Sequence, residues 1–214
     1  MPEIITASPW PGLALWTVLY IGDYAMTLAT ARLYRTQSPE KIVFEGSFEL
    51  TPVFQQDIDA LRAVSPRFLV TLFAINLLLW VQWRVTAASA SFSHYYLLIL
   101  GMLIAPQLVI HIRHLRNYFL FATALGEEGL QGRMEYPRVV VLRLSSIEIG
   151  TFAGLYCILF LVTGSWFFFG GVITCAVLAW KHRRLAVAHL RGLAQAAERG
   201  DAADEGNHPD GLRS

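Results

Sequence analysis

Long apolar runs alternate with charged blocks along this chain, and no other feature of the sequence constrains the fold as strongly. The charges gather in three blocks, at residues 32–67, 113–143 and 181–213. A run that crosses a hydrocarbon core of about 30 Å needs roughly 20 helical residues, and the segments between the blocks have room for one or two such runs each. With 15% charged residues and a mean hydropathy of +0.45, the chain is too apolar for an ordinary soluble domain. We therefore expect an all-α, polytopic transmembrane helical bundle.

Five segments of the chain are expected to span the membrane, and together they form a bundle over residues 1–199. They cover about residues 10–33, 68–86, 94–112, 144–162 and 166–180. The fifth segment is the shortest, because its 15 residues would cover only about 22 Å as a helix. The stretch 200–214 is acidic and rich in turn-forming residues, which predicts a disordered tail.

Sixteen of the seventeen Lys and Arg residues fall on one side of this five-span arrangement, and Arg84 is the exception. Membrane proteins retain positive charge on the cytoplasmic side. The sequence therefore predicts an N-out, C-in protein of the bacterial inner membrane. Its expected partners are membrane lipids, with a homo-oligomer or a membrane complex as further options. The net charge of +1 gives no reason to expect a nucleic acid as partner.

The first charged block contains a segment with helical periodicity. Thr51 can cap a helix that begins at Pro52, and Phe54 and Ile58 share its apolar face. This pattern predicts an amphipathic helix over about residues 52–64, which would lie on the inner leaflet or cap the bundle.

Several polar residues lie inside the predicted spans. Counted from the inner charges at about 1.5 Å per residue, Asp23 and Asn76 lie level near the midplane. An acidic residue at mid-span costs roughly 2.5–3.5 kcal/mol on insertion scales, so it normally faces the bundle interior and finds a partner. Asp23 is expected to be either a titrating functional group or a packing group bonded to Asn76 or a threonine. The predicted intramembrane polar pocket opens toward the cytosol and comprises Asp23, Thr27, Asn76, Gln107, His111 and Glu148.

The densest polar cluster lies at residues 111–117. His111 and His114 share one helix face at i, i+3, a geometry that can hold a metal, with Glu45 or Glu49 as a third ligand. This metal signal is weak, because neither an HExxH pattern nor a set of cysteine ligands accompanies it.

Arginines of the same cluster suggest an anion site. Arg113 and Arg116 share an adjacent helix face and can grip a phosphate or carboxylate by bidentate contacts, and Arg143 is expected to join them. The alternative is a positive-inside anchor that contacts lipid headgroups. The sequence contains no Walker, kinase, Rossmann or Gly-x-Ser-x-Gly pattern, so it predicts no catalytic class and no cofactor.

Three short motifs carry a family resemblance. They are Gly22-Asp23-Tyr24, the run from Phe44 to Pro52 that ends Glu-Leu-Thr-Pro, and His114-Leu115-Arg116-Asn117. Together they resemble an uncharacterised family of small bacterial multi-pass inner-membrane proteins. These proteins carry a membrane Asp followed by a loop with a Glu-x-Asn-Pro-like element, in which Thr51 stands here at the Asn position. The resemblance implies a multi-pass membrane protein and brings no activity with it.

Three hypotheses for the function are open at this point. In the first, Asp23 titrates in proton- or cation-linked binding and transport, and Glu148 and His111 relay charge toward the cytoplasm. The outer half of the bundle has no matching polar path, which counts against it. In the second, the chain binds or acts on a lipid-linked phosphate from the cytoplasmic leaflet, with Glu148 or His114 as acid or base. In the third, it is a non-catalytic subunit of a membrane complex whose polar core specifies helix packing.

Overall fold

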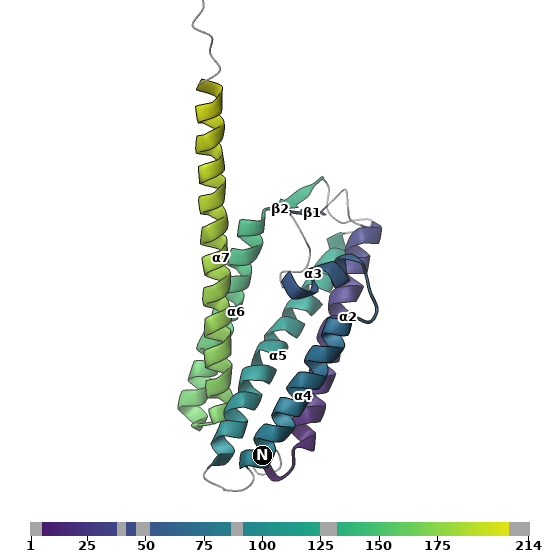
Figure 1. The fold of residues 1–214 in the computed structure, drawn as a ribbon, viewed down its shortest axis with the longest axis vertical. Helices are drawn as coiled ribbons and strands as arrows, with labels where there is room; N and C mark the ends of the chain where they lie inside the picture. Colours follow the sequence, from purple (N-terminus) through teal and green to yellow (C-terminus); the bar gives the residue numbers. More distant parts are fainter. Residues whose placement is uncertain (1–5, 38–41, 46–51, 87–91, 125–131, 206–214) are drawn as a thin grey trace, which may run out of the picture.

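Six helices and one pair of short strands make up the part of the chain that the computed structural model describes, which is residues 6–37, 42–45, 52–86, 92–124 and 132–205. The helices are α2 (Trp10–Gln37), α3 (Pro52–Asp59), α4 (Pro66–Thr86), α5 (Ser93–Ala124), α6 (Arg138–Thr163) and α7 (Trp166–Glu205). The strands are β1 (Ile42–Phe44) and β2 (Met134–Tyr136). The five long helices alternate in direction, so that the strand pair and α3 lie at one end of the bundle (Figure 1).

Four of these helices are long and apolar enough to cross a membrane, so the prediction of a transmembrane helical protein is confirmed at this level. The apolar segments are Trp10–Arg35, Pro66–Thr86, Ser93–Thr123 and Arg138–Thr163. Helix α7 contains the predicted fifth span, 166–180, but is not among them. Its apolar run is short because it leads directly into Lys181, Arg183 and Arg184.

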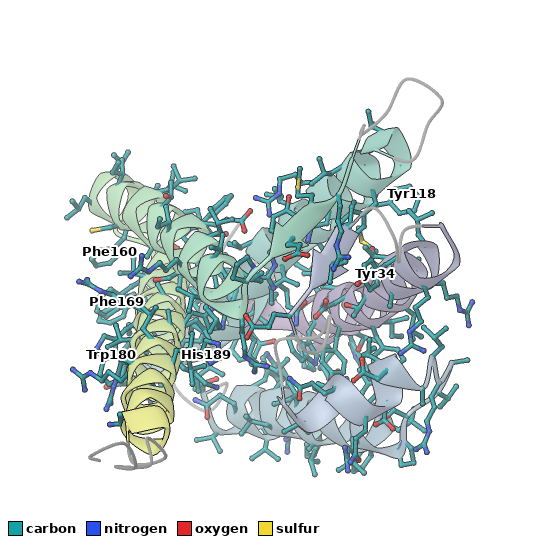
Figure 2. The ribbon with its side chains drawn as sticks, turned by 90° about the horizontal axis from the view of Figure 1, so that it is seen from above. Tyr34, Tyr118, Phe160, Phe169, Trp180 and His189 are labelled. Carbon is teal, nitrogen blue, oxygen red and sulfur yellow. The ribbon has the colours of Figure 1, made fainter. Side chains whose placement is uncertain are left out.

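The long helices do not pack in sequence order. Helix α7 packs along both α6 and α5, and α2 packs against α5, whereas α5 and α6 make few direct contacts. Seen along the bundle, α6 and α7 form a pair on one side, with α2 and α4 on the other (Figure 2). This order leaves space between α6 and the α2–α5 pair at the end that carries the strands.

The contact between α5 and α7 depends on glycine. A Cβ atom at Gly101 would collide with the backbone carbonyl of Phe167, and one at Gly170 with the carbonyl of Leu98. Small residues at such crossings let the backbones of membrane helices approach closely. A short bend completes the α6–α7 hairpin, where Gly164 adopts the left-handed conformation with φ 64°.

Aromatic stacking closes the bundle between α2, α4 and α5. The rings of Trp16 and Tyr20 stack at 5.1 Å, and Phe68 stacks on Tyr20 at 5.0 Å and on Tyr24 at 4.5 Å. The cluster continues through buried Tyr96 of α5. It fills the interior of the bundle between these three helices.

The amphipathic helix expected over 52–64 is present as α3, but it ends at Asp59. Leu61 then adopts a left-handed φ of 50°, which ends the helical path. Ile58 is buried against α2, so α3 caps the bundle. Asp57 is also buried, and its carboxylate accepts hydrogen bonds from Arg62 (3.0 Å) and Ser65 (2.5 Å).

Two further features differ from the expectation. Strands β1 and β2 pair in parallel, with Ile42 opposite Met134, and so join two loops that are far apart in the sequence. Helix α7 continues to Glu205, so residues 200–205 of the predicted disordered tail are helical, and 206–214 lie outside the described residues. The helix continues because the Ala- and Leu-rich segment before Gly200 consists of strong helix formers.

Replacing Gly101 by Leu should destabilise the bundle by about 1–3 kcal/mol or more, because the new side chain would enter the backbone of α7. Thermal unfolding in detergent, followed by circular dichroism, measures the loss. Gly154→Leu in α6 is the matched control, since a Cβ there meets no described atom within 4 Å. Equal melting temperatures for the two variants would contradict the packing of α5 on α7.

Candidate functional site

A cavity of about 620 Å³ lies between α2, α5 and α6. Phe54 and Ile58 of α3 and Tyr136 of β2 contribute to its wall at the end that carries the strands. Much of the remaining lining is apolar, and polar side chains form two groups within it.

The first group joins α2 to α5. His114 Nε2 lies 2.9 Å from the Asp23 carboxylate and 3.1 Å from the Thr27 hydroxyl. Thr27 donates its own proton to the backbone carbonyl of Asp23 at 2.9 Å. Because the carboxylate and the Thr27 oxygen are both acceptors here, His114 Nε2 carries a hydrogen and donates it. Gln107 of α5 lines the same part of the cavity.

Two buried polar atoms in this group have no hydrogen-bond partner among the described residues. They are Nδ1 of His114 and the side-chain oxygen of Gln107. Both side chains line the cavity, and both residues are 7% exposed. Buried polar groups are normally paired with protein or ordered water, so each of these two atoms has hydrogen-bonding capacity that the described protein does not use.

The second group contains the arginines. Arg113 donates to the Ser145 hydroxyl at 2.7 Å, and Arg116 forms an ion pair with Glu148 at 2.8 Å. Arg138 lies at the start of α6, and its backbone N–H donates to Glu45 at 2.9 Å. This backbone N–H holds the pKa of Glu45 below its usual range.

Ser145 links three helices. It accepts the hydrogen bond from Arg113 of α5 and lies 2.8 Å from His182 Nδ1 of α7. A serine hydroxyl can accept from Arg113 and at the same time donate to Nδ1 of a neutral His182 ring. Burial, together with nearby Arg113 and Lys181, lowers the pKa of His182 to about 4.

Most of the predicted pocket residues are brought together. Asp23, Thr27, Gln107 and Glu148 all line the cavity. His111 does not line it: its Nδ1 lies 2.8 Å from the Gln107 carbonyl, and its Nε2 lies against α2, where a Cβ at Gly22 would be 2.9 Å away.

Asn76 was wrongly placed with Asp23. Its side chain accepts a hydrogen bond from Thr17 (3.1 Å) and donates to the carbonyl of Leu72 (2.9 Å). It joins α4 to α2 away from the cavity. Asn76 meets α2 at Thr17, six residues or about 9 Å along the helix from Asp23, so the two residues do not lie at the same depth.

The predicted metal site is not formed by the described residues, in which no group of three His, Cys, Asp or Glu side chains could hold an ion. His114 turns to Asp23 and His111 to its own helix backbone. Glu49 lies outside the described residues.

Two of the three arginines that the sequence suggested for an anion site lie at the cavity. Arg113 and Arg116 line the cavity, whereas Arg143 is exposed and does not. Arg138, which the sequence analysis missed, lines the cavity with Glu45. Its signal was faint, because α6 was expected to begin at residue 144 and instead begins at Arg138.

Comparisons of this chain with protein-family models, with curated proteins and with solved structures found no match. The proposals below therefore depend on the geometry of the site.

Lowering the pH should destabilise the protein through His182. Its folded-state pKa of about 4 lies below the ordinary value of 6.5, so the unfolded chain binds the proton first. Stability that is fully present above pH 6.5 is lost as the pH falls toward 4, by on the order of 2 kcal/mol. Melting temperatures measured in detergent from pH 7 to pH 4.5 test this.

The variant His182→Gln should flatten the part of this pH dependence that His182 causes. His94→Gln is the control, since His94 lies on α5 near the opposite end of the bundle, against Trp166 of the α6–α7 hairpin. If wild-type and His182→Gln proteins show the same pH dependence, His182 is not held neutral by its surroundings.

Proposed function

We propose that this chain is a five-span, N-out, C-in protein of the bacterial inner membrane that binds a phosphate-bearing membrane amphiphile from its cytoplasmic side. The observation that carries the proposal is the convergence of Arg113, Arg116 and Arg138 on one cavity whose other walls are largely apolar. Guanidinium groups bind phosphate through paired N–H donors, and apolar walls accommodate hydrocarbon.

Contacts within the protein hold two of these arginines in place. Arg113 donates to Ser145, and Arg116 donates to Glu148 and to Asn117. A guanidinium group presents its N–H donors as a planar fork that matches the geometry of a phosphate. A headgroup would thus meet donors that are already positioned, which lowers the entropy cost of binding.

The arrangement of α5 and α6 supports entry from the side. The two helices make few direct contacts, and the cavity lies between them. Leu144 and Ile147 of α6 line the cavity and are also 54% and 67% exposed, and Leu120 of α5 is 47% exposed. Because these apolar side chains both line the cavity and are exposed on the outer surface, an acyl chain could pass between them.

The five-span arrangement is supported by the alternation of helix directions and by charge. Because α7 runs antiparallel to α6 along its length, its apolar first half would cross the membrane beside it (Figure 1). The strand pair, α3 and the basic segments then share one side, which the distribution of Lys and Arg assigns to the cytoplasm.

Replacing Arg113 and Arg116 together by Gln should weaken the binding of phosphatidylglycerol about tenfold or more, because each lost charge-assisted hydrogen bond contributes about 1.5–3 kcal/mol. Native mass spectrometry of the protein titrated with this lipid in detergent measures the affinity. Arg143→Gln removes the same charge from the exposed face of α6 and should bind like the wild type. An unchanged affinity in the double variant would contradict the proposal.

Proton-linked transport is a second candidate, favoured by the contact of Asp23 with His114. It ranks below lipid binding because a path to the far side would have to pass the aromatic cluster around Trp16 and Tyr20. If it operates, the purified protein will carry protons across liposomes under an imposed potential, and Asp23→Asn will stop the flux. Absence of flux in the wild type would eliminate this candidate.

A further inference from the structure

The polar group formed by Asp23, Thr27, Gln107 and His114 has hydrogen-bonding capacity that the described protein does not use; we refer to it as the acceptor niche. His114 Nε2 donates toward Asp23, and its Nδ1 is buried without a described partner. The side-chain oxygen of Gln107 is an acceptor, and it too is buried without a described partner.

An occupant that suits this niche must donate several hydrogen bonds. The carboxylate of Asp23 adds a second oxygen beyond the one bonded to His114, and it favours a cation. A primary ammonium group is a compact cation with N–H donors on one nitrogen. It could donate to the side-chain oxygen of Gln107 and to the second carboxylate oxygen of Asp23.

The niche lies close to the arginines. His114 directly follows Arg113, and adjacent Cα atoms are about 3.8 Å apart. Arg113 turns to Ser145 of α6, whereas His114 turns to Asp23 of α2, so the two side chains reach opposite walls of the same cavity. A single headgroup with a phosphate and an ammonium could contact both walls.

We infer that the cavity takes a zwitterionic phospholipid whose primary ammonium group occupies the acceptor niche while its phosphate contacts the arginines. This inference rests on the proposed function and adds the substrate class. The charges of the lining agree with it, because three carboxylates (Asp23, Glu45 and Glu148) accompany the three arginines. A lining of both signs favours a zwitterion over a simple anion.

The experiment compares three lipids with matched acyl chains by native mass spectrometry of the full chain in detergent. Phosphatidylethanolamine has a primary ammonium group, phosphatidylcholine has a quaternary one without N–H donors, and phosphatidylglycerol has no cation. The wild type should bind phosphatidylethanolamine about tenfold more tightly than either of the others, because the niche is satisfied by that lipid alone.

Gln107→Leu should lower the affinity for phosphatidylethanolamine and so reduce this preference. It should not lower the melting temperature of the lipid-free protein, because the amide oxygen it removes has no described partner. Asn76→Leu is the matched control: its amide is bonded to Thr17 away from the cavity, so it should cost stability and retain the lipid preference. Asp23→Asn should also reduce the preference.

The outcomes separate this inference from the proposed function. Equal wild-type affinities for the three lipids, or a preference that survives both Gln107→Leu and Asp23→Asn, would overturn the ammonium site while arginine-dependent phospholipid binding stands. If substitution of Arg113 and Arg116 lowers the affinity for none of the three lipids, the phosphate site is wrong. A preference for phosphatidylethanolamine that still depends on Gln107 would then support the ammonium site alone.

Discussion

The close contact of α5 with α7 is the constraint on which the site depends. Because Gly101 and Gly170 let the two backbones meet, α7 packs directly along α5. Helix α6 packs along α7 and meets α5 at few positions. The cavity is what remains between them, so its existence follows from helix order as well as from the residues that line it.

The cavity also explains the distribution of polar contacts within the bundle. On the α2 side, Asp23 and His114 satisfy each other, and on the α6 side Arg113, Ser145 and His182 connect three helices. These contacts position the charged groups without filling the space between them. Such fixed polar walls around an unfilled centre are typical of binding sites, whereas a polar core that serves packing alone would be closed by its own hydrogen bonds.

The sequence predicted the elements well where the signal was local. The spans over 68–86 and 94–112 lie within α4 and α5, and the amphipathic pattern after Pro52 became α3. Helix ends were less predictable, because charged residues such as Arg138 and Arg116 continue a helix beyond the apolar run that identifies it. The strand pair gave no signal, since three-residue strands are too short for an alternating pattern.

The sequence by itself determined that apolar helices dominate this protein and that one end of the bundle is basic, because both properties depend on the composition of single segments. It also singled out Asp23 as a residue that requires a partner, since a carboxylate in an apolar segment is costly wherever the segment packs. Which partner it has was decided by the tertiary structure. Helix α5 presents His114 to Asp23, whereas α4 presents Asn76 to Thr17. These pairings depend on how each helix is rotated and shifted against its neighbour, and the spacing of residues along one helix does not contain that information.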